Sequence, residues 1–295
     1  MGEYMITCCS SADLSREHFE KRNIPVVYFH FELDGVNYLD DMGGSVSPEE
    51  LFRRMSEGAQ TKTSQVSVAE YCSFFEPYLK KGTDILHVTL SSGISGTYNS
   101  AMLAAKDLSE QYPDRKIYIV DSLGASSGYG LIMDTLADMR DAGMDIDMLY
   151  NWVEKNKLHM HHWFFSTDLT FFIRGGRVSK TAGTVGQVLN IWPLLNMDHL
   201  GRLIPREKIR GKKKVMKRVV EMMKEHADQG TEYSRKCYMC HSLCEEDAKI
   251  LAEMIEKEFP KLNGKVEIYP IGALIGSHTG PGTISTFFWG DLRED

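Results

Sequence analysis

The chain has 295 residues, of which 42% are hydrophobic, 10% aromatic and 25% charged, and its formal net charge is −7. A chain of this length and aromatic content buries a sizeable core, commonly in two domains, and is not disordered. The acidic balance argues against a nucleic-acid-binding protein, whose surface is basic. No apolar run approaches the roughly 18 residues of a membrane-spanning helix, and the first residues lack the pattern of a secretory signal. We therefore expect a cytoplasmic protein.

Strands and helices alternate over the first half of the chain. Apolar runs predict strands at 6–9, 24–31, 84–90 and 116–120. Apolar residues at helical spacing predict helices at 14–22, from 48, around 71–78, after 97 and over 123–140. Residues 61–67 are polar and predict a loop. This alternation indicates an α/β unit with a largely parallel sheet, whose functional loops follow the carboxyl ends of the strands.

The pattern changes from about residue 156. Residues 163–165 and 170–172 resemble strands or packing segments around a turn, and 189–204 predict a hairpin. Helices at 211–227 and 245–258, strands at 236–241 and 265–271, and a glycine-rich loop at 276–283 follow. We therefore predict an α/β protein of two domains, residues 1–155 and 156–295, the second with a mixed or antiparallel sheet.

The most informative segment is the passage from strand 84–90 into the next helix. Hydroxyl side chains and glycines fill this junction, from Ser91 to Thr97. A strand that opens directly into a helix directs free backbone N–H groups at one point, which suits an anion. The alternative is an ordinary turn with a Ser or Thr cap. These residues alone leave the two interpretations open.

Three polar loops, at 61–67, 91–97 and 276–283, also permit a serine hydrolase. Ser95, Asp121 and His278 occur in the order of a hydrolase triad, but Thr97 stands where the nucleophile elbow has its second glycine. Neither a phosphate-binding P-loop nor a dinucleotide fingerprint occurs in the sequence. An esterase that uses Ser95 with His278 remains the alternative hypothesis.

Two groups of residues resemble metal sites. The first has the spacing of a zinc cluster, but strand alternation would direct its members to opposite faces, and cysteines of a large cytosolic chain are usually reduced thiols. The second is a histidine cluster that we attribute to an exposed turn. The first group comprises Cys237, Cys240, His241 and Cys244, and the second comprises His159, His161 and His162. We expect no metal at either group.

Basic residues gather in two places. Arg174-Gly175-Gly176-Arg177 is either a tight turn with two solvated arginines or a means of projecting a guanidinium at a carboxylate or a partner. The run at 206–218 is either a solvated helix face or a docking patch for an anionic surface.

Taken together, these segments resemble the DegV family of fatty-acid-binding proteins over nearly the whole chain. Six segments in order carry the resemblance: Thr63-Ser64-Gln65, Ser91 to Tyr98, Asp121-Ser122, Arg174 to Ser179, Arg210 to Lys213, and Gly276 to Gly282. The resemblance implies two α/β domains with one fatty acid buried between them. It also implies the role of the acyl-carrying subunit of bacterial fatty acid kinase, which presents its ligand to an ATP-dependent kinase subunit and performs no chemistry itself.

The resemblance and the physical interpretation agree on the ligand site. A carboxylate cannot be buried without hydrogen-bond donors. A long-chain fatty acid such as palmitate, stearate or oleate would be the ligand, without any other cofactor. The expected carboxylate site comprises Thr63, Ser64, Ser92, Ser95, Gly96, Thr97 and His278, and the backbone N–H groups of 95–97. Arg174 and Arg210 are expected on the face that meets the kinase, and the 206–218 run is expected to contact the kinase or an anionic membrane surface.

The sequence departs from the family pattern at two positions. Cys9 stands where the first strand usually ends in Asp, and Val66 stands where the loop after Ser64 usually has Pro. The missing Asp puts one hydrogen bond at the edge of the site in doubt. The expected carboxylate donors lie elsewhere in the sequence.

Overall fold

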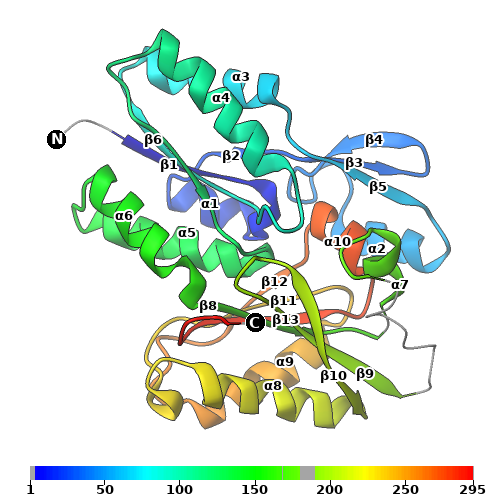
Figure 1. The fold of residues 1–295 in the computed structure, drawn as a ribbon. Helices are drawn as coiled ribbons and strands as arrows, with labels where there is room; N and C mark the ends of the chain where they lie inside the picture. The colour runs from blue at the N-terminus through cyan, green and yellow to red at the C-terminus, as the bar shows by residue number, and fades with distance from the viewer. Residues whose placement is uncertain (1–3, 168, 180–189, 295) are drawn as a thin grey trace.

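The computed structural model describes residues 4–167, 169–179 and 190–294, and every structural statement below concerns these residues (Figure 1). The first sheet is parallel and has the strand order β2-β1-β6-β7. Its strands are β1 (Tyr4–Cys9), β2 (Val26–Val27), β6 (Asp84–Thr89) and β7 (Ile117–Asp121). The parallel sheet expected from the alternating pattern is therefore confirmed.

Helices cover both faces of this sheet. Figure 1 shows α3 (Val68–Lys80) and α4 (Thr97–Gln111) on one face, and α5 (Ser126–Asp141) and α6 (Ile146–Asn156) on the other. A capping box defines the start of α3, because the Ser67 hydroxyl accepts from the Glu70 N–H and the Glu70 carboxylate accepts from the Ser67 N–H. Two shorter helices, α1 (Arg16–Lys21) and α2 (Pro48–Ser56), lie in the connections.

A small antiparallel sheet adjoins the first one. Its order is β4-β3-β5, formed by β3 (His30–Leu33), β4 (Val36–Leu39) and β5 (Thr61–Ser64). The loop predicted at 61–67 is wrong for its first four residues, which pair with β3 as an edge strand. An edge strand with its side chains half exposed tolerates this polar sequence, and its two threonines favour the extended backbone.

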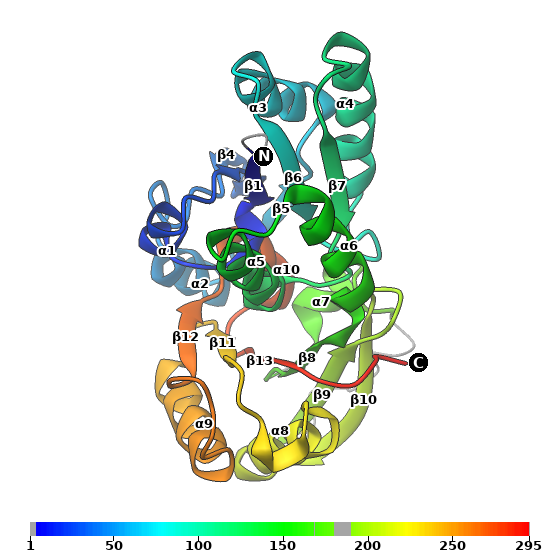
Figure 2. The same ribbon diagram turned by 90° about the vertical axis from the view of Figure 1, so that its left-hand side faces the viewer.

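The second half of the chain builds a six-stranded sheet of order β10-β9-β8-β13-β11-β12, antiparallel except for the β11–β12 pair. Helices α8 (Lys212–His226) and α9 (Glu245–Glu258) lie on its outer face (Figure 2). The strands are β8 (Met160–Phe165), β9 (Ile191–Met197), β10 (Leu203–Arg210), β11 (Tyr238–His241), β12 (Glu267–Pro270) and β13 (Ile284–Trp289). The expected mixed sheet is confirmed, although the sequence pattern does not predict β13, one of its central strands.

Two short helices replace predicted strands or loops. Residues 170–174 form α7 (Thr170–Arg174), and the first half of the glycine-rich loop predicted at 276–283 belongs to α10 (Ala273–Thr279). Gly276 allows α10 to pack closely on α2, because a Cβ atom there would lie 2.6 Å from the Phe52 ring. Gly280, with φ of +68°, ends the helix. Single turns of 3-10 helix lie at Ser10–Ala12, Lys157–His159 and Gly230–Glu232.

The two halves of the chain are joined by packing as well as by sequence. The first two sheets precede residue 156 and the six-stranded sheet follows it. However, α5 also packs on β8, β11 and β13, and α10 packs on α2, β3 and β5 of the first half. The domain boundary at residue 155 therefore stays a prediction. Among the described helices, none combines the length and apolarity that a bilayer crossing requires.

Candidate ligand-binding site

A cavity lies where the three sheets and α10 meet. The space between its lining atoms amounts to about 930 Å³, its open mouth included. Small-molecule sites have walls of this kind, mostly apolar with a few polar groups for orientation. Its apolar lining comprises Phe29, Leu90, Ile94, Ala125, Phe164, Phe172, Met197, Leu203, Leu274, Ile275 and Phe287.

A hydroxyl and an imidazole from the two halves of the chain meet at the cavity wall. Thr63 Oγ1 lies 2.7 Å from His278 Nε2. The β5–β3 pairing positions Thr63 opposite Phe31, and the close packing of α10 on α2 positions His278. The expected residues Ser64, Ser95 and Gly96 also line this cavity. Five of the seven residues predicted for the carboxylate site are thus brought together.

His278 is held in its neutral form. Burial, together with the positive charge of Arg177, lowers the pKa of His278 to about 4. Its Nδ1 atom is buried without a hydrogen-bond partner in the described part of the chain. Gly175 lies directly against that atom, since a Cβ there would approach it to 2.3 Å. A neutral imidazole retains one N–H, and when Nε2–H donates to Thr63 Oγ1 the Thr63 hydroxyl can donate to an anion.

Backbone N–H groups of the 91–97 segment form more hydrogen bonds within the segment than expected. The Ser95 N–H donates to the Ser91 carbonyl at 3.1 Å, and the Thr97 N–H donates to Ser95 Oγ at 3.3 Å. Two of the three backbone N–H groups predicted for the carboxylate therefore already have partners. Gly96 is covered by Gln65, whose Oε1 would lie 2.3 Å from a Cβ at that position.

Two predicted ligands do not line the cavity. Ser92 is exposed, and its N–H donates to Asp121 Oδ1 at 3.1 Å. Thr97 is buried in the first turn of α4, where its hydroxyl lies 2.7 Å from the Tyr71 hydroxyl. The expectation that both contact the carboxylate does not hold in this structure, because the strand-to-helix turn directs one outward and the other into the core.

Cys9 lies behind this turn rather than in the cavity. Its Sγ is 3.2 Å from the Tyr71 hydroxyl and 3.6 Å from His87 Nε2. Complete burial raises the pKa of the Cys9 thiol to about 11, so the group is neutral. The residue that departs from the family pattern therefore supports Thr97 through Tyr71 and does not meet a ligand.

Arg177 is the arginine of the 174–177 turn that reaches the cavity wall. It is half-buried, with Nε donating to the Ile94 carbonyl at 3.2 Å and Nη1 to the Gly175 carbonyl at 2.5 Å, and burial lowers its pKa. Arg174 is exposed and covers the Phe171 ring at 5.4 Å. Arg210 is exposed at the end of β10. The sequence shows two arginines around two glycines, but only the folded turn reveals that Arg177 reaches the cavity wall and Arg174 does not.

The geometry does not assemble the hydrolase alternative. His278 is hydrogen-bonded to Thr63, whereas the Asp121 carboxylate accepts from the N–H groups of Ser92 and Leu123. A triad needs a nucleophile–base bond and a carboxylate that orients the base. Within the described residues His278 has no such carboxylate, so Ser95, Asp121 and His278 do not form a triad.

The cysteine group is not assembled as a metal site. All six cysteines are free thiols, and burial raises the pKa of Cys240 to about 12 and that of Cys244 to about 11. Among the described residues, Cys237, Cys240, His241 and Cys244 do not bring three ligand atoms together at metal-binding distance. The exposed turn predicted for His161 and His162 is wrong, because both are buried on β8.

The comparisons with known proteins agree with the fold. Residues 5–291 match the family model described as "Uncharacterised protein, DegV family". A DegV domain-containing protein of Clostridium perfringens is 36% identical over 294 residues, 100% of both chains. A fatty acid-binding protein of Thermotoga maritima is 32% identical over 285 residues, 93% of both chains. The structure of a DegV family protein of Thermus thermophilus, described for fatty acid binding, is 25% identical, with a TM-score of 0.87 over 98% of this chain and 100% of the other.

Proposed function

Because the chain belongs to the DegV family, we propose that it binds one long-chain fatty acid in this cavity, with the carboxylate beside Thr63 and His278. The observation that carries the proposal is a hydroxyl–imidazole pair, 2.7 Å apart, on the wall of a cavity that is otherwise largely apolar. The relatives described as fatty acid-binding proteins support the same ligand class.

The apolar wall supplies affinity and the polar groups supply orientation. Burial of each methylene contributes about 0.8 kcal/mol, so a chain of about 14 methylenes contributes roughly 11 kcal/mol before the costs of binding. The Arg177 guanidinium on the cavity wall offsets the charge of a carboxylate, while Ser64 and Ser95 offer hydroxyl donors nearby. Palmitate, stearate and oleate are ligands of this class.

The bound fatty acid is then presented to an ATP-dependent kinase subunit, which forms the acyl phosphate. This part of the proposal rests on the resemblance to acyl-carrying subunits and on two exposed arginines, Arg174 and Arg210. The basic run at 206–218 contributes to the same face only in part. Lys212 pairs with Asp247, and Arg218 pairs with Glu207, Glu221 and Glu225. Lys213, Lys214 and Lys217 stay exposed for an anionic partner or membrane surface.

We also propose that the carrier works in the cytoplasm. Six free thiols without a disulfide are typical of a reducing compartment.

Lipid extraction of the purified protein followed by mass spectrometry tests the ligand directly. We expect one copurified fatty acid per chain. The Thr63→Val variant keeps the side-chain shape and loses the hydroxyl, so we expect its affinity for a fluorescent fatty acid to fall about tenfold or more, as for hydrogen bonds to charged groups. Thr135→Val is the matched control, because the Thr135 hydroxyl bonds only within α5, to the Leu131 carbonyl, and Thr135 does not line the cavity. Lipid-free protein that also fails to bind added fatty acid would contradict the proposal. Turnover of a p-nitrophenyl ester that is lost in Ser95→Ala would support the hydrolase instead.

The kinase role is tested with the exposed arginine of the 174–177 turn. We expect Arg174→Ala to retain bound fatty acid and to lower acyl phosphate formation by a fatty acid kinase subunit at least tenfold, because a bidentate contact with the partner is removed. Phosphorylation that is undiminished while fatty acid remains bound would show that Arg174 does not serve the partner.

A further inference from the structure

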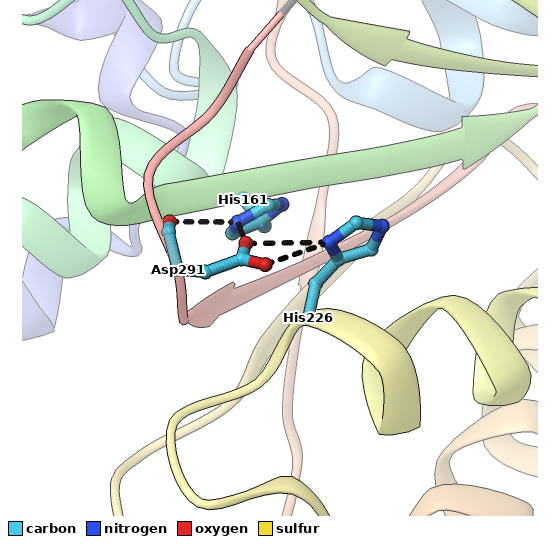
Figure 3. Close-up of side chains that lie close together, drawn as sticks. All are labelled: His161, His226 and Asp291. Atoms are coloured by element: carbon cyan, nitrogen blue, oxygen red, sulfur yellow. Dashed lines mark hydrogen bonds and ion pairs between the residues drawn. The ribbon is translucent and has the colours of Figure 1, made fainter.

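Three metal-ligating side chains from distant parts of the sequence meet on the outer side of the six-stranded sheet. His161 belongs to β8, His226 is the last residue of α8, and Asp291 follows β13. One ligand atom of each lies within 4.8 Å of the other two (Figure 3). Among the described residues, no other group of three or more His, Cys, Asp or Glu side chains is gathered in this way.

The backbone holds two of these residues together independently of their side chains. The Asp291 N–H donates to the His226 carbonyl at 2.9 Å, and the Asp228 N–H donates to the Trp289 carbonyl at 3.1 Å. Gly290 permits this close approach, because a Cβ at that position would lie 2.1 Å from the His226 carbonyl oxygen. The donors are therefore brought together by the fold itself, as a preorganised ligand site requires.

The third ligand is fixed by the sheet. His161 pairs across the strands with Phe288, and its ring stacks on the Phe288 ring at a centroid distance of 5.2 Å and an angle of 4°. Its Nε2 atom lies 2.9 Å from Asp291 Oδ1 and 3.0 Å from the Asp291 backbone carbonyl oxygen. His226 Nδ1 lies 3.2 Å from both carboxylate oxygens. Two imidazole nitrogens thus converge on one carboxylate.

The nitrogen–oxygen separations are close to those between ligands of one metal ion, and the two imidazole nitrogens lie within 4.8 Å of each other. Ligand atoms that surround a zinc ion tetrahedrally at about 2.0–2.1 Å are about 3.3 Å from one another. The observed nitrogen–oxygen separations of 2.9–3.2 Å differ from that value by only a few tenths of an ångström.

The site is accessible, and one ring has to adjust. The Asp291 side chain is 58% exposed and that of His226 33%, whereas His161 is buried. The two imidazole rings stack at an angle of 21°, so one ring has to turn before both lone pairs point at a shared ion. His226 is the more exposed of the two rings, and its turn has to release a stacking contact with Trp163 at a centroid distance of 5.8 Å.

We propose that His161, His226 and Asp291 bind one divalent ion of the late first-row transition metals, with zinc as the representative. Two imidazoles and one carboxylate are a nitrogen–oxygen donor set that suits zinc, cobalt and nickel. Water or the Asp291 carbonyl completes the coordination. The ion clips the segment after β13 to β8 and to the end of α8, three elements that are far apart in the sequence.

This site is separate from the fatty acid cavity. Side chains alternate along β8, and His162 lines the cavity while His161 lies on the opposite face of the strand. The metal proposal therefore does not depend on the proposed lipid ligand, and each can fail alone.

Calorimetric titration of the chelator-treated full chain with Zn²⁺ tests the proposal, and Co²⁺ absorption spectra report the coordination. We expect one ion per chain, and at least tenfold weaker binding in His226→Gln and in Asp291→Asn. Both variants keep hydrogen-bonding groups of similar size, so circular dichroism is expected to confirm that they fold. Zn²⁺ should raise Tm in the wild type and not in these variants, because an ion that binds only the folded state stabilises it.

His241→Gln is the matched control, since His241 lies beside the cysteines on β11 and outside the three-ligand group. We expect it to bind Zn²⁺ as the wild type does. The proposal is overturned if the wild type fails to bind Zn²⁺ or Co²⁺ stoichiometrically at 100 μM. A dissociation constant of that size corresponds to a binding free energy of about 5.5 kcal/mol. Equal affinity in the wild type and both ligand variants, or a loss confined to His241→Gln, overturns it as well.

Discussion

At the scale of single residues, the polar part of the cavity combines a neutral imidazole with a nearby cation. His278 is neutral because it is buried and because Arg177 is close, while Arg177 itself rests on two backbone carbonyls. A carboxylate that enters this place gains the attraction of the guanidinium and a hydrogen bond from the Thr63–His278 pair. The expected binding energy of the head group therefore depends on Arg177 more than on Arg174.

Substitution of each arginine by glutamine, one at a time, tests this distinction. We expect Arg177→Gln to weaken fatty acid binding about tenfold or more, because the charge on the cavity wall is lost. The same variant should raise the pKa of His278, since the Arg177 charge contributes to the lowered value. Arg174→Gln, at the exposed end of α7, should change the affinity less than twofold. NMR titration of the His278 ring measures the pKa, and competition with a fluorescent fatty acid measures the affinity. A larger loss in Arg174→Gln would refute the assignment.

At the scale of elements, helix α5 packs through Gly128 against two rings of the cavity wall. A Cβ at Gly128 would lie 2.4 Å from His162 Nε2 and 2.6 Å from a carbon of the Phe287 ring. Both rings line the cavity. Although alanine is a better helix former than glycine, it fits here only if these rings move.

Gly128→Ala is therefore expected to lower both stability and affinity. Overpacking in a close-packed region costs about 1–3 kcal/mol, which exceeds the helix-propensity gain of about 1 kcal/mol. Urea unfolding measures the stability and fluorescence competition the fatty acid affinity. Thr135→Ala, a half-buried position of the same helix that does not line the cavity, is the control and should retain the wild-type affinity. A stabilised Gly128→Ala variant would show that the rings adapt without cost.

The elements also show how far the sequence could predict this fold. The parallel sheet followed from strand-length apolar runs that alternate with helical spacing, and β9–β10 followed from the turn at residues 198–201. Strand β5 was missed because Thr-Lys-Thr-Ser has no apolar face, and its pairing with β3 is a tertiary contact. The helix at 273–279 was missed because its glycine is unfavourable locally and is required by the packing on Phe52.

The site was predictable to the same degree. Thr63, Ser95 and His278 follow from polar loops in the right order, and the structure brings them to one cavity. The failures, Ser92 and Thr97, come from side-chain direction in a turn, which residue type does not reveal. Nothing local in the sequence connects His161 with His226 and Asp291, because their contact depends on the return of β13 beside β8.

At the scale of the whole molecule, buried neutral histidines make the fold sensitive to acid. Burial lowers the pKa of His87 to about 3, and that of His278 is about 4. Unfolded histidine has a pKa of about 6.5. Between these values the unfolded chain binds more protons than the folded chain, so the free energy of unfolding rises with pH and falls on acidification.

We expect a loss of about 2 kcal/mol for each of these two histidines between pH 7.5 and pH 5. Urea unfolding at the two pH values measures it. His87→Gln removes one titrating group, so the difference between the two pH values should shrink by about 2 kcal/mol, whatever the variant costs at pH 7.5. An unchanged pH dependence in this variant would show that His87 is not the acid-sensitive group.

The Thr63–His278 pair has a consequence for the synthesis of the protein. Its members are 215 residues apart, and His278 belongs to α10, which ends at Thr279, near the end of the chain. Domains generally fold as they leave the ribosome, beginning with the N-terminal part. A nascent chain that has completed both N-terminal sheets still lacks the imidazole that faces Thr63. At the proposed site, both groups can therefore meet a carboxylate only after residue 278 has emerged.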